Sequence, residues 1–248
     1  MILCAFDIEA TGLDKQKDRM IEVGLALYST AQNKVLESTG FMVQSDGVTV
    51  SEEITGITGI TQAALDRVGY EPVTALEEFN TYAHQADAII AHNGERFDKP
   101  MVEAAAARLK VPLEHKLWID TMTDIPGVKG EQLITMCAKV GFLYNAHSAL
   151  DDAKATVEMA RRHSADPAKS WEKIVERAQS PIVLLRAHQD RDKNEDAKKF
   201  KFRWNPENKI WWKPVKEMDI PELESNAPFG LSRLDKTYTI EMLDTKSA

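Results

Sequence analysis

The stretch ILCAFDIEATGL, residues 2–13, decides the fold of the first half of the chain. Residues 2–8 are apolar and β-prone apart from Asp7, and Thr11-Gly12 breaks the run. Similar β-prone runs follow at 20–28 and 34–43, with a polar turn between them. Together the three runs predict an antiparallel meander of three strands.

The rest of the first 165 residues alternates helix and strand patterns. Apolar residues at helical spacing predict helices, and one compact apolar run predicts a strand. The predicted helices cover 73–86, 101–109, 131–140 and 149–162, and the strand covers 88–91. Three meander strands followed by helix and strand in turn predict an α/β fold with a mixed sheet, in which parallel strands extend the meander and helices flank it.

Composition changes along the chain predict four segments. Residues 1–165 form the α/β domain, and 166–180 form a linker with a bridging helix. Residues 181–225 form a small basic and aromatic α+β module, and 226–248 a polar tail. We therefore expect one good-sized domain with a small appendage.

Composition also limits the class of protein. The 248 residues are 43% hydrophobic and 28% charged, which is typical of a globular protein. There is no apolar run long enough for a membrane span, and the first residues do not resemble a secretory signal. The two cysteines are interpreted as reduced core residues. These features predict a cytoplasmic protein with no membrane contact, and they do not indicate an oligomeric state.

The formal net charge of −8 argues against a nucleic-acid partner only at first sight. Carboxylates that hold divalent cations count as negative charges in the sequence, although bound cations compensate that charge in the protein. Residues 181–216 contain ten Lys and Arg against five Asp and Glu. The distribution of charge is therefore more informative than its total.

Two carboxylates, Asp7 and Glu9, stand on the first predicted strand. Side chains alternate between the faces of a strand, so both point to the same side. Two like charges on one face of a strand need a compensating cation. The alternative is that the strand ends before them and that both face water.

Two further segments add acids and a histidine. HNGERFD, residues 92–98, places Asp98 at the start of the 101–109 helix, where an acid alone is equally typical of a helix cap. HSALDDA, residues 147–153, places His147 in a turn and Asp152 on the first turn of the next helix. An isolated histidine of this kind is usually a surface residue. Asp120 is interpreted as the N-cap of the segment that follows it.

The three segments DIEATGL, HNGERFD and HSALDDA, in this order, resemble the exonuclease motifs of the DnaQ-like 3′→5′ exonucleases (DEDD, histidine subtype). The resemblance covers residues 1 to about 163. It implies a ribonuclease H-like fold and a phosphodiester hydrolase that removes terminal nucleotides. The segment ITGIT, residues 54–58, also resembles the family's stretch leading into the helix beside the substrate.

The resemblance implies a role for each motif residue. Metal ligation falls on Asp7, Glu9, Asp98 and Asp152, with His147 as general base, for two Mg²⁺ ions that Mn²⁺ can replace.

Substrate contacts fall on Thr11, Gly12, Leu13 and Asn93. The spacing from Asn93 to Asp98 is one residue longer than the family pattern, so Asn93 is the weaker assignment.

The basic module has its own pattern. Residues 200–204, FKFRW, and 209–213, KIWWK, flank a turn at 205–208 and predict a β-hairpin. Phe200, Phe202 and Trp204 are expected to share an apolar face with Ile210 and Trp212. The opposite face would then carry a set of basic and aromatic side chains, namely Lys201, Arg203, Lys209, Trp211 and Lys213.

That second face has two interpretations. Lys201 and Arg203 with a stacking Trp211 would suit single-stranded nucleic acid, because bases stack on aromatic rings and cations follow the phosphates. Packing of Trp211 in a small core, with a protein partner docking on the module, is equally compatible with the pattern.

The leading functional hypothesis is a metal-dependent 3′→5′ exonuclease that releases nucleoside monophosphates from 3′ ends of single-stranded DNA. The alternatives are an exoribonuclease, since contacts to a 2′-hydroxyl cannot be located in the sequence, and a proofreading or nucleic-acid-binding subunit of a replication or repair complex.

Overall fold

A computed structural model describes residues 1–189 and 194–244 of the chain. The chain divides into two compact units, Met1–Ala178 and Gln179–Ala248. Each unit has its own sheet, and each is described by itself. Within the described residues, no helix is both long and apolar enough to cross a bilayer.

The first unit is built on a five-stranded sheet with the order β3-β2-β1-β4-β5. The first three strands pair antiparallel, and β4 and β5 are parallel to β1. Their bounds are β1 Ile2–Ala10, β2 Met20–Ser29, β3 Lys34–Met42, β4 Ala88–Ala91 and β5 Leu117–Asp120. The predicted mixed sheet is confirmed, and β5 is a strand that the sequence interpretation missed.

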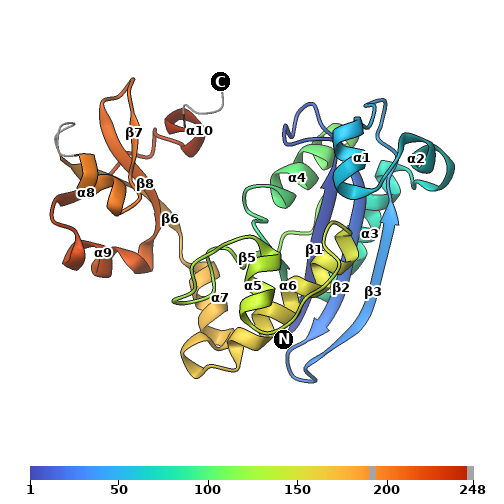
Figure 1. The fold of residues 1–248 in the computed structure, drawn as a ribbon, viewed down its shortest axis with the longest axis horizontal. Coiled ribbons are helices and arrows are strands. Elements are labelled where there is room, and N and C mark those ends of the chain that lie inside the picture. Colours follow the sequence, from blue (N-terminus) through green and yellow to red (C-terminus); the bar gives the residue numbers. More distant parts are fainter. Residues whose placement is uncertain (190–193, 245–248) are drawn as a thin grey trace. The chain divides into compact units, whose positions relative to one another are not determined.

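Helices cover both faces of this sheet (Figure 1). On one face, even-numbered residues of β1 such as Phe6 pack against α3 (Pro72–Gln85) and α4 (Asp98–Leu109). On the other face, Leu3 and Ala5 pack against the second set of helices. These are α5 (Leu133–Lys139), α6 (Ala149–Ser164) and α7 (Trp171–Gln179). The buried strands β1 and β4 are therefore central in a three-layer arrangement.

Two short helices, α1 (Glu52–Thr58) and α2 (Gln62–Val68), enclose a small separate core with Ile21 of β2. The ITGIT segment lies in α1. Ser51 caps the start of α1 by accepting a hydrogen bond from the Ile54 N–H, and Gly59 ends it in the left-handed conformation at φ 74°.

The expected linker at 166–180 is mostly part of the first unit. A 3₁₀ turn at Pro167–Lys169 follows α6, and Ile174 of α7 is fully buried in the same core as α5 and α6. The helix that was expected to bridge the units packs on the first one because its apolar stripe is long enough to be buried there.

The second unit has a four-stranded antiparallel sheet with the order β7-β8-β6-β9. The strands are β6 Ile182–His188, β7 Arg203–Asn205, β8 Ile210–Lys216 and β9 Gly230–Arg233. Its helices are α8 Asn194–Lys199, α9 Ile220–Asn226 and α10 Ile240–Leu243, with a 3₁₀ turn at Glu217–Asp219.

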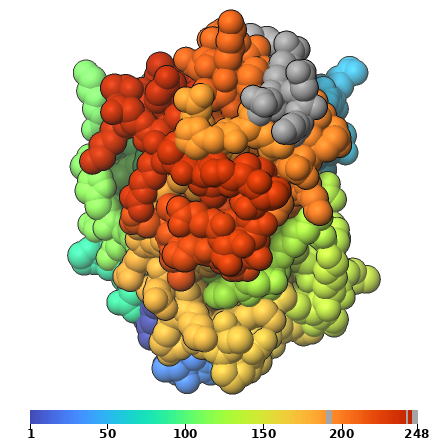
Figure 2. Space-filling model, turned by 90° about the vertical axis from the view of Figure 1, so that its left-hand side faces the viewer, coloured from blue at the N-terminus to red at the C-terminus, as the bar shows by residue number. Residues whose placement is uncertain are grey.

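The expected polar tail at 226–248 is wrong for its described part. β9 pairs with β6 from Leu185 to His188, and Leu243 is buried against Trp212. Figure 2 shows the red C-terminal residues directly against the orange ones of the same unit. The sheet needs this segment because a second apolar face would otherwise be exposed. Residues 245–248 of the expected tail lie outside the described residues.

Candidate active site

The first two acids lie at the carboxyl end of β1. Asp7 and Glu9 have the same parity as Leu3 and Ala5, so they emerge on the sheet face that α6 covers. Both are half-buried. The prediction that they share one strand face therefore agrees with the geometry.

The start of α6 brings Asp152 to the same place. Its position depends on Gly24 of β2, which is the strand partner of Asp7. A Cβ atom at Gly24 would lie 2.2 Å from the backbone of Ala149, so only glycine lets the helix approach this closely. Ligand oxygens of Asp7, Glu9 and Asp152 all lie within 4.8 Å of one another.

Asp98 reaches the strand from the other side of the site. It is the first residue of α4 and is 2% exposed, and its Oδ1 accepts a hydrogen bond from the backbone N–H of Ile8 at 3.1 Å. The acid is therefore attached to β1 between Asp7 and Glu9 and does not function as an exposed helix cap.

The electrostatics of the cluster are unfavourable for the protein alone. Burial, then the charges of Asp98 and Asp152, raise the pKa of Asp7 well above its usual range. Burial, then Asp152 and Glu22, raise the pKa of Glu9 to about 7, and burial raises that of Asp98 to about 8. The native fold thus holds several carboxyl groups in an environment that disfavours their charged form.

A divalent cation fits this donor set. All the groups are hard carboxylate oxygens, the ligand type preferred by Mg²⁺ and Mn²⁺. In the described part of the chain, no protein group donates a hydrogen bond to the Asp7 or Glu9 carboxylate, so their oxygens stay available for a ligand. A cation between them would offset both the burial and the repulsion that raise their pKa values.

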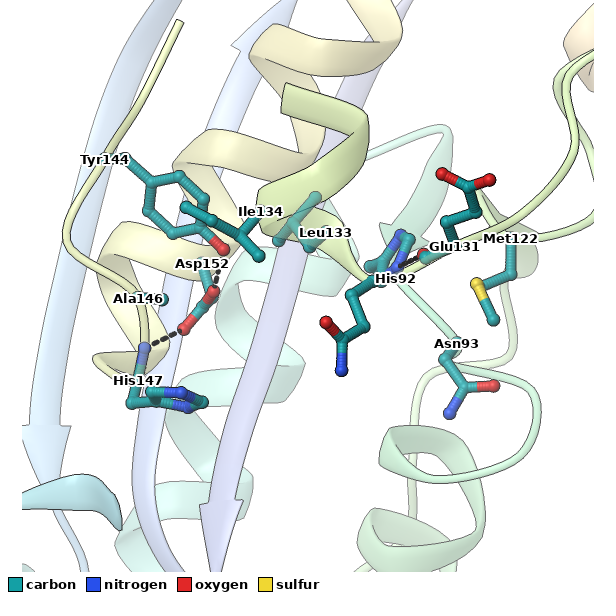
Figure 3. Close-up of a pocket in the computed structure, with 11 residues that line it drawn as sticks. His92, Asn93, Met122, Glu131, Leu133, Ile134, Tyr144, Ala146, His147 and Asp152 are labelled. Atoms are coloured by element: carbon teal, nitrogen blue, oxygen red, sulfur yellow. Dashed lines mark hydrogen bonds between the residues drawn. The ribbon is translucent and has the colours of Figure 1, made fainter. Parts of the chain in front are cut away.

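Asp152 differs from the other two because the protein holds both of its oxygens. Tyr144 donates its hydroxyl to Oδ1, and the backbone N–H of His147 donates to Oδ2 at 2.9 Å (Figure 3). Burial raises the pKa of Asp152, and these two hydrogen bonds act in the opposite direction. His147 itself is exposed and has a left-handed backbone at φ 69°.

A pocket of about 390 Å³ adjoins Asp152 and His147. Figure 3 shows Asn93 and Met122 on the side away from His147, with Leu133 and Ile134 of α5 between them. The pocket therefore offers an apolar wall beside polar groups, next to the acidic cluster.

The loop that follows β1 is well ordered by hydrogen bonds. Thr11 donates its hydroxyl to Asp18 and accepts the N–H of Arg19, both at 3.0 Å. A Cβ atom at Gly12 would lie 2.5 Å from the Asp18 carboxylate, so a larger residue there would displace the side chain that holds Thr11. Leu13 is 85% exposed, so its side chain is available to a ligand.

Asn93 begins the turn that leads to Asp98 and has a left-handed backbone at φ 64°. Its N–H donates to Asp120 Oδ1 at 2.8 Å, and that of Glu95 to Oδ2 at 3.3 Å. Asp120 Oδ1 also accepts the N–H of Met122 at 2.9 Å, so it caps the turn that follows it, as expected. No helix follows before α5, and the same buried carboxylate orders the Asn93 turn as well.

The sequence interpretation also missed two side chains at the site, Glu22 and Tyr144. Glu22 is the strand partner of Glu9, and it accepts the N–H of Ala149 at 2.9 Å, so it holds the start of α6. An acid inside an apolar strand was the available signal for Glu22. Tyr144 had no such signal, because its contact with Asp152 depends on the path of the connecting loop.

In the second unit the structure agrees with the packing interpretation of Trp211 and not with the stacking one. Trp211 pairs with Trp204 across the hairpin and is only 4% exposed, in a core with Phe202. Asn205 pairs with Ile210, so even-numbered residues of β7 share a face with odd-numbered residues of β8. Phe202 and Trp204 keep their expected face, and the two faces of β8 are exchanged.

The two basic residues assigned to this hairpin differ from each other. Arg203 stacks over the Trp212 ring at 4.5 Å and forms an ion pair with Asp244. Lys201 precedes β7, is exposed and has φ 62°. The cationic head of Arg203 is thus already bound within the unit, whereas Lys201 is open to solvent.

Comparison with known proteins agrees with the motifs and the geometry. The RNase_T family profile, described as Exonuclease, matches residues 4–160. The chain belongs to this exonuclease family. The DnaQ-like resemblance and the nuclease activity class predicted from the sequence are therefore confirmed. Members of the family depend on divalent metal ions, which accords with the acidic cluster.

Two bacterial relatives of this exonuclease are polymerase components. A DNA polymerase III PolC-type protein of Caldanaerobacter subterraneus subsp. tengcongensis is 31% identical over 162 residues, which cover 62% of this chain and 11% of that protein. A DNA polymerase III subunit epsilon of Treponema pallidum is 28% identical over 189 residues, covering 72% of this chain and 84% of the subunit.

A solved structure shows the same fold. The nuclease domain of 3′hExo, a DEDDh family member bound to rAMP, superimposes with a TM-score of 0.57 and 22% identity. The match covers 68% of this chain and 94% of that domain. The ribonuclease H-like fold of the first unit is thereby confirmed.

Proposed function

We propose that this exonuclease removes nucleoside monophosphates from the 3′ ends of single-stranded DNA by two-metal-ion phosphodiester hydrolysis. The observation that carries the proposal is the convergence of Asp7, Glu9 and Asp152, whose oxygens lie within 4.8 Å of one another. The preference for DNA rests on the polymerase III relatives.

The acids have separate roles in this proposal. Asp7, Glu9 and Asp152 would hold one Mg²⁺ ion, and Asp98 with Asp7 would hold the second. When bound, the two ions activate a water molecule and stabilise the leaving 3′-oxygen. Mn²⁺ is expected to replace Mg²⁺, because it accepts the same oxygen ligands.

The remaining residues bind the substrate and move a proton. His147 accepts the proton of the attacking water, a role suited to a histidine near neutral pH. Its exposed ring lies in a loop beside the cluster, so it can approach when a substrate fills the site. The loop at Thr11, Gly12 and Leu13 holds the terminal nucleotide. Asn93 lines the pocket that adjoins Asp152, at the side away from that acid.

The second unit supports this activity in one of two ways. Lys201, exposed and cationic, is placed to contact backbone phosphates. Alternatively the unit docks on a protein, as expected if the chain acts within a replication or repair assembly. The polymerase III relatives favour this second candidate.

A degradation assay with three 5′-labelled substrates tests the proposal. Single-stranded DNA, duplex DNA and RNA of one sequence are incubated with protein and Mg²⁺. We expect shortening from the 3′ end of single-stranded DNA first and no shortening with Asp7→Ala. Faster loss of RNA would make the enzyme an exoribonuclease. Intact substrates with the wild-type protein would contradict the exonuclease proposal for the isolated chain.

A further inference from the structure

The side chain of Tyr144 lies outside the motifs but touches the acidic cluster. Its hydroxyl donates to Oδ1 of Asp152, and the His147 N–H occupies Oδ2 of the same carboxylate (Figure 3). A carboxylate oxygen has two lone pairs, so an oxygen that accepts this hydrogen bond can still bind a cation. The contact therefore orients Asp152 without removing it from the metal site.

The tyrosine is itself firmly placed. Its ring packs beside Phe142, at 6.5 Å between centroids, and both rings lie against the core beneath α5 and α6. Arg162 of α6 stacks over Phe142 at 4.7 Å and donates to the Val140 carbonyl at 2.9 Å. The 140–147 segment is thus attached to the last part of α6 through Arg162 and to its first turn through Asp152.

This attachment connects the base to the metal ligand. The segment ends in His147, whose left-handed backbone at φ 69° is unfavourable for a residue with a Cβ atom and needs support from its surroundings. The Tyr144 hydroxyl and the His147 N–H hold opposite oxygens of one carboxylate. A change in the orientation of Asp152 would therefore also move the backbone of His147.

We propose that Tyr144 is a positioning residue that fixes the carboxylate of Asp152 toward Asp7 and Glu9 and so raises the affinity of the site for divalent metal. The inference rests on the proposed function, because it assumes that Asp152 is a ligand. Second-layer hydrogen bonds to metal ligands typically change metal affinity or activity by about 10–100-fold.

Calorimetric titration of Mn²⁺ into chelator-treated full-length protein tests this role. Tyr144→Phe keeps the ring and removes only the hydroxyl, so we expect the Mn²⁺ dissociation constant to rise by about 10–100-fold. The metal concentration for half-maximal nuclease activity should rise in parallel, with recovery of activity at saturating metal.

Tyr28→Phe is the matched control. Tyr28 is buried in the first unit, whereas Tyr144 is partly buried there. The Tyr28 hydroxyl donates to Asn33 Oδ1, on the connection between β2 and β3. Its loss should lower the melting temperature to a similar extent but leave Mn²⁺ affinity unchanged.

The outcomes separate the two proposals. Wild-type Mn²⁺ affinity in Tyr144→Phe would overturn the positioning role, even if the variant melts earlier. Equal weakening in both tyrosine variants would also overturn it, because the effect would then be general destabilisation. Absence of Mn²⁺ binding by the wild-type chain would instead count against the proposed function.

Discussion

The two units place their charged side chains in opposite surroundings. In the first unit, Asp7 and Glu9 lie beside other acids, and burial raises their pKa values. In the second unit, Arg203 is stacked on Trp212 and paired with Asp244, within a sheet in which Trp211 and Trp212 are buried. A cluster that repels itself requires an external ligand, whereas a paired and packed cluster stabilises the fold. Variants in the two regions should therefore affect different measurements.

The largest expected effect belongs to Asp7→Asn, which keeps the side-chain shape and removes the charge. Metal ions supply several kcal/mol of transition-state stabilisation, so nuclease activity should fall by about a thousandfold or more. Without metal the variant should melt at a higher temperature, because the repulsion with Asp98 and Asp152 is relieved. Steady-state degradation and thermal melting measure the two effects, and activity within tenfold of the wild type would contradict the assignment.

Trp211→Ala should have the opposite profile. Removing a buried tryptophan costs about 3–5 kcal/mol of folding free energy, so the second unit should unfold early in denaturant while Mn²⁺ affinity is unchanged. Lys201→Ala, an exposed change in the same unit, is the control and should leave unfolding unaltered. Weakened single-strand binding by Trp211→Ala at normal stability would restore the stacking interpretation.

The fold and the site differ in how far sequence alone predicts them. The shared face of Asp7 and Glu9 follows from the local alternation of one strand, and the apolar stripe of α6 follows from helical spacing. The pairing of Glu9 with Glu22 depends on the register of β1 against β2, and the sequence of the connection between these strands does not specify that register. Tyr144 reaches Asp152 only through the path of a loop.

The hairpin shows the same limit in a different form. The order of strand, turn and strand was predicted, but the first strand is Arg203–Asn205 rather than 200–204. The faces of β8 are exchanged, because the closing pair is Asn205 with Ile210. A shift of one residue in register moves every side chain to the other face. Trp211 therefore lies in the core with Trp204, and the basic face that was expected around it is not formed.

Gly24→Ala tests whether the approach of α6 to the sheet places Asp152. The new Cβ would meet the Ala149 backbone, so we expect a loss of about 1–3 kcal/mol in stability and weaker Mn²⁺ binding. Gly56→Ala is the matched control, because nothing lies within 4 Å of its Cβ position in α1. That variant should be slightly more stable, by about 0.5–1 kcal/mol. Wild-type Mn²⁺ affinity in Gly24→Ala would contradict the claim that the approach of α6 to the sheet places Asp152.

A further expected effect concerns pH. Burial raises the pKa of Glu9 to about 7 and that of Asp98 to about 8 in the folded chain, whereas unfolded carboxyl groups titrate near 4. The folded state thus binds more protons between these values, so stability without metal should fall as pH rises from about 4 to 8. We expect this loss to appear as a drop in melting temperature.

Bound metal should reverse this trend. With saturating Mg²⁺ the carboxylates are compensated, so the melting temperature should stay level or rise over the same pH range. The Asp98→Asn variant should show a smaller fall without metal than the wild type. An identical pH profile with and without Mg²⁺ would contradict the role of these acids in metal binding.

The most direct test of the central claim is a crystal structure of the chain grown with Mn²⁺, measured at a wavelength where manganese scatters anomalously. We expect an anomalous peak within coordinating distance of Asp7, Glu9 and Asp152, and a second one between Asp7 and Asp98 when a nucleotide is bound. A clear density map with the three carboxylates ordered and no anomalous peak between them would contradict it.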